Sequence, residues 1–324
     1  MWVCVVSFGN WYYMKIAFQM DPLDNINFAS DTTWQLIIEA VNRGIVYHYT
    51  PAQLSWHDGK LLAHARQVHI AKDHSYTLLD QQVIDLSEMD VIWVRQDPPY
   101  DMAYLTTTYL LEKVADQVLI INNPKAIRNF PEKISVLDYP DLIPPTLITY
   151  DYQEAMDFAK KYDRAIIKPL YSFAGSDVFC LAHNDINFAN VMTNLIQIHK
   201  TPVIIQKFIP EVTLGDKRII LVNGEPVGAF IRKPKAGDIR ANLACGGEAI
   251  PSDITDHELK ICQAIRPKLV ENGLFFVGID VIAGYLTEIN VTSPTGVVKI
   301  QAYSNPKIVT DVWDAIEDHI KVIV

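Results

Sequence analysis

The stretch FVGIDVIAGYLTEINVTSPTG, residues 276–296, decides the fold that we predict for the C-terminal half of the chain. Two apolar runs flank an Ala-Gly pair at 283–284, which is typical of a β-hairpin. Antiparallel partners share a constant sum of residue numbers, so a pairing of Asp280 with Glu288 requires a turn of odd length, here about three residues. Alternate strand residues share a face, so Asn290 lies one step further on the same surface.

The two opposed carboxylates of this hairpin predict a divalent metal site. On an apolar sheet, Asp280 and Glu288 would repel each other and lose hydration, at a cost of several kcal/mol unless a cation lies between them. Mg²⁺ is the candidate because it takes oxygen ligands and usually keeps waters and substrate phosphates in its shell. The alternative is a solvated strand face with ordinary charges. The apolar runs on both sides indicate burial and favour the metal.

Composition limits the classes of function. The chain has 324 residues, 49% of them hydrophobic, which suffices for two domains or for one large domain with a lobe. A formal net charge of -10 argues against nucleic acid or an anionic membrane as the main partner. The four cysteines lack C-x-x-C spacing and disulfide density, so we expect reduced thiols in a cytoplasmic protein.

The first half of the chain alternates strand and helix patterns from residue 14 onwards, which predicts an open α/β sheet that is at least partly parallel. One helix is expected after Ser30, a plausible N-cap, with Gly44 as its stop. We interpret residues 1–13 as an N-terminal extension, with an extra edge strand as the alternative. Prolines at 124 and 131 mark the predicted end of this domain, 14–131.

The second half, residues 132–324, mixes helices and strands and predicts an α+β unit. Asn223-Gly224 indicates a hairpin, and Asp151 with Glu154 and Thr255 with Glu258 have the spacing of capping boxes. We expect Pro267 to kink its helix. The last 19 residues, from Pro306, have the pattern of an amphipathic helix.

Basic side chains lie beside several predicted loops. Lys168 ends a buried strand immediately before the small-residue loop YSFAGS, whose backbone N–H groups could hold an anion, and Lys133 lies in NFPEKIS. No Walker pattern or G-x-G-x-x-G is present, and each lysine alone is more often a surface charge. Arg218 and Arg240 lie beside candidate ligand loops and suit carboxylate or phosphate, although hairpin-edge charges are the alternative. Arg95 follows a buried strand at the edge where α/β sheets bind ligands, or it is an exposed turn residue.

Several motifs together closely resemble the bacterial glutathione synthetases, which are ATP-grasp ligases. They are QMDPLDNINFASDTTW (19–34), VRQDPPYD (94–101), IIKPL (166–170), GDKRIILVNGEPVGAFIRKPKAGDIRANLACGG (215–247) and the opening stretch. The resemblance runs from about Met14 almost to the C-terminus. It implies an N-terminal substrate domain and an ATP-grasp domain, in which 132–205 form the central lid and 206–324 the catalytic subdomain.

The resemblance also implies a role for each matching position. The implied nucleotide-binding residues are Lys133, Lys168, Gly175, Ser176, Gln206, Lys207, Phe208, Ile209 and Asp216. The implied metal ligands, for Mg²⁺ or Mn²⁺, are Asp280, Glu288 and Asn290. The implied catalytic residues are Arg218, Arg240 and Asn242, and the implied substrate-binding residues are Arg95, Arg232, Ser293, Thr295 and Gly296. Two departures from the family pattern are a loop at 171–176 with one glycine, Gly175, and Glu248-Ala249 in place of an arginine and a glycine.

The function implied by the resemblance is ATP-dependent ligation of γ-glutamylcysteine to glycine through an acyl phosphate, with release of ADP and phosphate. A homo-oligomer, a tetramer in particular, is expected, with neither nucleic acid nor membrane as partner. Two alternatives stay open at this point: an ATP-grasp ligase for another amino acid or peptide, and a nucleotide-binding protein without turnover.

Overall fold

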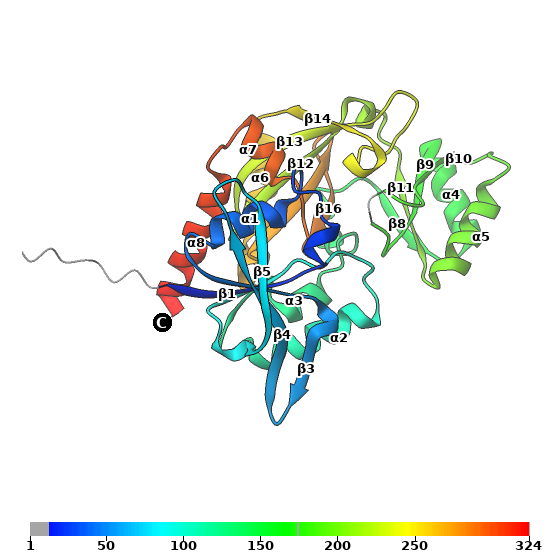
Figure 1. Cartoon of the computed structure of the whole chain (residues 1–324). Coiled ribbons are helices and arrows are strands. Elements are labelled where there is room, and N and C mark those ends of the chain that lie inside the picture. Colours follow the sequence, from blue (N-terminus) through cyan, green and yellow to red (C-terminus); the bar gives the residue numbers. More distant parts are fainter. Residues whose placement is uncertain (1–12, 174, 324) are drawn as a thin grey trace, which may run out of the picture.

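The computed structural model in Figure 1 describes residues 13–173 and 175–323, and arranges them around three β-sheets. Apart from Tyr13, the predicted N-terminal extension lies outside the described residues. Short 3₁₀ turns connect many elements. They are Leu23–Asn25, Pro51–Gln53, Leu86–Glu88, Glu112–Val114, Ser135–Asp138, Pro210–Leu214 and Leu243–Cys245.

The N-terminal sheet has seven strands in the order β3-β4-β2-β1-β6-β7, with β5 paired to β4. Its parallel strands are β1 (Met14–Gln19), β2 (Gly44–Tyr49), β6 (Val91–Val94) and β7 (Leu119–Ile121). Its antiparallel additions are β3 (Leu54–His57), β4 (Lys60–Ile70) and β5 (Tyr76–Asp85). The helices of this region are α1 (Thr32–Ala40), α2 (Met102–Leu111) and α3 (Pro124–Asn129). The predicted open, partly parallel α/β sheet is confirmed.

Helix α1 differs at both ends from the prediction. Its N-cap is Asp31 rather than Ser30, because Asp31 Oδ1 accepts a hydrogen bond of 2.7 Å from the backbone N–H of Trp34. The helix ends at Ala40, and Gly44 is the first residue of β2 instead of a helix stop. A Cβ at Gly44 would lie 2.1 Å from the carbonyl oxygen of Met14. Gly44 therefore permits the close approach of β2 to β1.

A small four-stranded antiparallel sheet forms a lobe of its own, at the right of Figure 1. Its order is β10-β9-β11-β8, with β8 (Thr146–Thr149), β9 (Arg164–Pro169), β10 (Phe179–Ala182) and β11 (Val203–Lys207). Helices α4 (Tyr152–Tyr162) and α5 (Phe188–His199) pack on it through a separate apolar core. Asp151 caps α4 by accepting from the N–H of Glu154, as predicted, but the Glu154 carboxylate bonds Thr149.

The C-terminal sheet contains the hairpin with which the sequence analysis began. Its order is β14-β13-β12-β15-β16, with β12 (Asp216–Val222), β13 (Glu225–Lys233), β14 (Glu248–Pro251), β15 (Phe276–Ile282) and β16 (Tyr285–Asn290). The helices of this unit are α6 (Asp256–Glu271), α7 (Val297–Tyr303) and α8 (Ile308–Ile323). The Thr255–Glu258 capping box is present, and α6 runs through Pro267 as one helix.

The predicted pairing of Asp280 with Glu288 is present, but the predicted three-residue turn is wrong. Ile282 pairs with Tyr285 across a two-residue turn, Ala283-Gly284, in which both residues have positive φ. The register shifts by one residue between Asp280 and Val281. A β-bulge, in which one strand carries an extra residue, therefore supplies the odd residue that the turn lacks.

A shared apolar core joins the N-terminal and C-terminal sheets. Phe18 and Trp93 from the first sheet meet Phe276 from the second and Trp313 from α8. The buried side chain of Asn122 also crosses between them, donating to the carbonyls of Phe276 and Val291 and accepting from the N–H of Phe276. The two sheets are therefore fixed relative to each other, and the loops that follow β6 lie beside the loop that follows β16.

Candidate active site

A cavity of about 480 Å³ lies between the small lobe and the C-terminal sheet. Of the twenty candidate site residues predicted from the sequence, seventeen line this cavity. They come from segments far apart in the chain. They are Lys133, Lys168, Gly175, Gln206, Lys207, Phe208, Ile209, Asp216, Arg218, Arg232, Arg240, Asn242, Asp280, Glu288, Asn290, Ser293 and Thr295. Among the described lining residues, Arg95, Ser176 and Gly296 do not appear.

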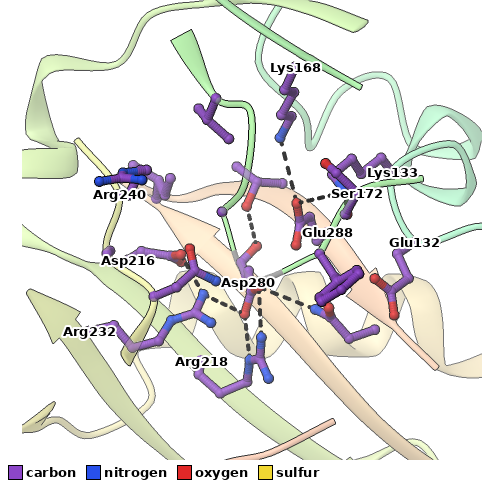
Figure 2. A pocket seen from close by; sticks show the side chains of 18 of the residues that line it. Glu132, Lys133, Lys168, Ser172, Asp216, Arg218, Arg232, Arg240, Asp280 and Glu288 are labelled. Carbon is purple, nitrogen blue, oxygen red and sulfur yellow. Dashed lines mark hydrogen bonds and ion pairs between the residues drawn. The ribbon is translucent and has the colours of Figure 1, made fainter. Parts of the chain in front are cut away.

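Asp280 lies at the centre of a charged cluster on the floor of this cavity (Figure 2). Strand register places Arg218 opposite Asp280 and Arg232 opposite Asp216. Arg218 donates through Nε to Asp280 Oδ1 at 2.6 Å and through Nη2 to Oδ2 at 2.9 Å, which is a bidentate pair. Arg232 Nη2 lies 2.9 Å from the same Oδ1 and also donates to Asp216 Oδ2.

The two carboxylates of this cluster have opposite pKa shifts. Burial opposes ionisation of Asp280, but Arg218 and Arg232 outweigh it and hold the pKa of Asp280 below its ordinary value. Burial raises the pKa of Asp216 to about 7, with Arg232 opposing the rise and the charge of Asp280 adding to it. Asp280 is therefore the permanent anion of the cluster, since its two arginines compensate its charge.

Glu288 has looser partners than Asp280. Lys168 Nζ lies 3.7 Å and Lys133 Nζ 3.8 Å from Glu288 Oε1, which is too long for a hydrogen bond. Lys133 Nζ donates instead to the carbonyl of Ser172. Burial lowers the pKa of Lys168, and the charge of Glu288 opposes that shift. Both lysines reach the cavity, from the loop after α3 and from the end of β9.

These charges change the reason for expecting a metal. Two carboxylates that face each other would need a cation between them, but in the structure four basic side chains compensate Asp280 and Glu288. The donor set nevertheless fits a hard divalent ion. Asn290 uses Nδ2 to donate to Gly278 O and Asp280 Oδ2, both at 3.2 Å, and its amide oxygen accepts no hydrogen bond from the described residues. Glu288, whose contacts are ion pairs longer than hydrogen bonds, supplies a second oxygen site.

The segment 206–209 lines the part of the cavity contributed by β11 and its following loop. Gln206 is buried, and its side-chain amide donates to Thr146 Oγ1 at 3.1 Å. The guanidinium of Arg164 lies 4.7 Å from the ring centre of Phe208. Ile166 and Val212 add apolar lining. This part of the wall is mostly apolar with a few polar groups, as is typical of sites for small molecules.

Two loops that line the cavity meet each other, the loop after β9 and the loop between β13 and β14. A Cβ at Gly175, which has φ +74°, would lie 2.7 Å from Asn242 Oδ1. A side chain at 175 would therefore strain the backbone and displace the Asn242 amide. Arg240, in the second loop, is bonded through its guanidinium and backbone N–H to Asp238. Glu248 and Ala249, the other departure from the family pattern, lie on β14 and are not among the lining residues.

The remaining predicted residues, Arg95, Gly296 and Ser176, do not line the cavity. Arg95 is 3% exposed, donates to Thr33 Oγ1 at 2.9 Å and to the carbonyl of Pro294 at 3.0 Å, and so supports the loop that carries Ser293 and Thr295. The N–H of Gly296 donates to Thr32 Oγ1 at 3.1 Å. Ser176 bonds the carbonyl of Phe173 within its own loop.

Sequence reasoning missed several lining residues, of which Glu132 has the clearest chemistry. Its Oε1 accepts a hydrogen bond of 3.1 Å from Thr292 Oγ1. Burial raises the pKa of Glu132, and the charge of Glu288 adds to the rise while Lys133 opposes it. In Figure 2, Glu132 lies on the far side of Glu288 from Arg232 and Arg240. Its position next to Lys133 was the available signal, but a lone glutamate usually marks a surface.

One further observation restricts the metal chemistry of the site within residues 13–173 and 175–323. No group of three or more His, Cys, Asp or Glu side chains is placed to hold a metal, so any ion there depends on an amide, water or substrate oxygen as well.

In the part of the chain that the structure describes, every helix falls short of the length and apolar character that a membrane span requires.

Comparisons with known proteins cover both halves of the chain. The family model described as prokaryotic glutathione synthetase, N-terminal domain, matches residues 14–128, and the model for the prokaryotic glutathione synthetase ATP-grasp domain matches residues 132–305. The glutathione synthetase of Brucella melitensis biotype 1 is 46% identical over 94% of this chain and 98% of its own length. That of Vibrio parahaemolyticus serotype O3:K6 is 36% identical over 95% and 99%.

Solved structures are similar at much lower identity. The crystal structure of the D-cycloserine synthetase DcsG has a TM-score of 0.67 and 12% identity, over 94% of this chain and 99% of its own. A RiPP-associated ATP-grasp ligase from Chryseobacterium gregarium, in complex with ADP and a leader and core peptide, has a TM-score of 0.62 and 17% identity, over 94% and 97%. At these identities the likeness shows the fold alone, and it confirms the predicted ATP-grasp architecture.

Proposed function

The chain belongs to the prokaryotic glutathione synthetase family, and from that premise we propose how its residues carry out the ATP-dependent synthesis of glutathione from γ-glutamylcysteine and glycine. One observation carries the proposal. Two carboxylates on neighbouring strands, Asp280 and Glu288, lie in a single cavity with two lysines and two arginines. Such a site can bind a polyanionic nucleotide and a carboxylate substrate together.

Nucleotide binding is assigned to two parts of the cavity. The segment 206–209 takes the adenine ring, and Lys133 and Lys168 bind the phosphates. Each ammonium group has three N–H donors, and the Glu288 contacts at 3.7 and 3.8 Å leave most of them available. The backbone N–H of Gly175 adds a donor beside the phosphates, and Ser176, whose N–H and hydroxyl both bond the carbonyl of Phe173, holds this loop in shape. Asp216 positions Arg232 for the same region.

The chemical step is a phosphoryl transfer followed by an acyl transfer. The cysteinyl carboxylate of γ-glutamylcysteine attacks the terminal phosphorus of ATP, which gives ADP and an acyl phosphate. The amine of glycine then attacks the acyl carbon, the C–O bond to phosphate breaks, and glutathione forms. Arg218, Arg240 and Asn242 stabilise the negative charge on the reacting groups, and Arg232, Ser293, Thr295 and the loop held by Arg95 and Gly296 orient the substrate.

Asp280, Glu288 and Asn290 would hold Mg²⁺, or Mn²⁺ in its place. A divalent ion there would spread the charge of the transferring phosphoryl group, as in other phosphoryl transfers. The available oxygens of Glu288 and Asn290 support this assignment. We further propose a cytoplasmic homotetramer. The free thiols of Cys180 and Cys262 agree with a reducing compartment, and the assembly rests on family resemblance.

The test is ADP release from ATP and magnesium with γ-glutamylcysteine and glycine, each omitted in turn. Release that requires both substrates, with glutathione found by mass spectrometry, supports the proposal. Release that requires a different amino acid or peptide would assign the site to another ATP-grasp ligation. Nucleotide binding without any release would refute turnover.

A further inference from the structure

A small side chamber of about 40 Å³ adjoins the main cavity. The chamber therefore lies directly beside the reaction space, because five residues line both the chamber and the main cavity. They are Pro98, Glu132, Ser172, Phe173 and Thr292. A space of 10–15 Å³ is about enough for one water-sized group. The chamber therefore has room for a small polar group.

Two polar groups of the chamber are poorly satisfied by the protein. Tyr104 is 2% exposed, and its hydroxyl has no hydrogen-bond partner among the described residues. A buried polar group without a partner is costly, and it indicates a missing partner such as a ligand or a water. Glu132 accepts from Thr292 through Oε1, and its second oxygen accepts no hydrogen bond from the described residues. The backbone of Glu132 is fixed to β16 by the N–H of Ile289, at 3.0 Å.

The charge of the chamber selects a cation. Glu132 lines it, and the charge of Glu288 acts on Glu132 from the main cavity. Lys133, the next residue in the chain, is already bonded to Ser172 O and paired with Glu288. An anion would be repelled, and a neutral group would leave the carboxylate uncompensated. A primary ammonium matches both groups, because it offers three donors to acceptors such as Glu132 Oε2 and Tyr104 Oη.

We propose that Glu132 and Tyr104 form the subsite that anchors the ammonium group of the acceptor amino acid beside the reacting carboxyl group. This inference rests on the proposed function, in which glycine is the acceptor. It assigns a task to a carboxylate and a hydroxyl that nucleotide binding and phosphoryl transfer do not use. Because the chamber shares its wall with the main cavity, the acceptor's nitrogen is held next to the acyl group. The ammonium group first gives one proton to solvent, the free amine attacks the acyl carbon, and the second proton leaves with the released phosphate.

The experiment compares Glu132→Gln and Tyr104→Phe with wild type in steady-state kinetics, with each substrate varied in turn. Loss of a charged hydrogen-bond partner predicts a rise of about 10- to 100-fold in the KM for glycine in Glu132→Gln, and loss of a neutral one about 2- to 10-fold in Tyr104→Phe. The rise in the glycine KM should exceed any change in the KM for ATP or γ-glutamylcysteine by at least about fivefold in Glu132→Gln. Tyr109→Phe, on the exposed side of the same helix, is the matched control.

A second acceptor separates ammonium binding from structural damage. Hydroxylamine is uncharged at neutral pH and can take the place of glycine, giving a hydroxamate of γ-glutamylcysteine. Glu132→Gln should reduce glycine ligation far more than hydroxamate formation, whereas a damaged fold would reduce both equally. Equal losses, or an unchanged glycine KM in both variants, would overturn the assignment while leaving the wild-type activity in place. A wild-type enzyme whose ADP release does not require glycine would overturn the proposed function as well.

Discussion

Replacing Asp280 by Asn should destabilise the protein by about 3–5 kcal/mol, because the change removes the shared counter-ion of two buried arginines. The side chains of Asp280, Arg218 and Arg232 are 3%, 7% and 6% exposed, so solvent cannot take over the role of the carboxylate. Asn has nearly the same shape, and no cavity is created. The loss is therefore electrostatic, and it is large against the 5–15 kcal/mol that is about the whole stability of a typical domain.

Urea unfolding of the protein without metal or nucleotide measures this loss, with Asp318→Asn as the control. Asp318 pairs with Lys321 at 2.9 Å, but both side chains are more than two-thirds exposed, so that change should cost about 0–1 kcal/mol. Adding Arg218→Met to Asp280→Asn should recover part of the loss, because Arg218 then no longer leaves a buried charge without a carboxylate partner, whereas Arg232 keeps its pair with Asp216. If Asp280→Asn unfolds at the same urea concentration as Asp318→Asn, the reasoning that Asp280 anchors the two arginines is wrong.

Three further predictions address the site and the fold. Glu288→Gln should abolish magnesium-dependent ADP release and leave the urea midpoint nearly unchanged, and unchanged activity would contradict the metal assignment. Gly175→Ala should raise the KM for ATP several-fold, because its Cβ would lie 2.7 Å from Asn242 Oδ1. Gly59→Ala is the control, since Gly59 has a similar φ with open space around it, and this change should affect stability alone. Equal kinetics in the two variants would refute the loop contact. Burial lowers the pKa of His48 from 6.5, so the unfolded chain binds a proton that the folded chain rejects, and stability should fall as pH drops below about 6.5. His48→Gln should weaken that fall, and an identical pH profile of unfolding would exclude His48 as its source.

Local patterns predicted the C-terminal hairpin well, because the residues that determine its strand pairing and its turn lie close together in the sequence. The pairing of Asp280 with Glu288 followed from their shared parity, and the Ala-Gly turn from its residue types. The turn length was wrong because parity alone cannot distinguish a longer turn from a bulge. Helix α1 shows the same limit, since Gly44 serves a close approach to Met14 that no neighbouring residue reveals.

The charges around the hairpin could not be predicted in the same way, because they come from distant parts of the chain. Lys133 and Lys168 reach Glu288 from another segment and another lobe, and their pairing depends on how the sheets pack. The two carboxylates alone were therefore insufficient to predict the metal site. Glu132 was missed for the same reason, because its burial against Thr292 arises only when the loop after β16 folds back.

The two carboxylates of the hairpin have different tasks, and the difference follows from their contacts. Asp280 is held by a bidentate arginine at 2.6 and 2.9 Å and by a second arginine at 2.9 Å, so its oxygens are already committed to the protein. Glu288 has ion pairs of 3.7 and 3.8 Å, which a ligand can replace at small cost. An incoming metal ion therefore meets Glu288 first, and Asp280 serves mainly to keep the arginines in position. On this reasoning, loss of Asp280 appears first as lost stability and loss of Glu288 first as lost turnover.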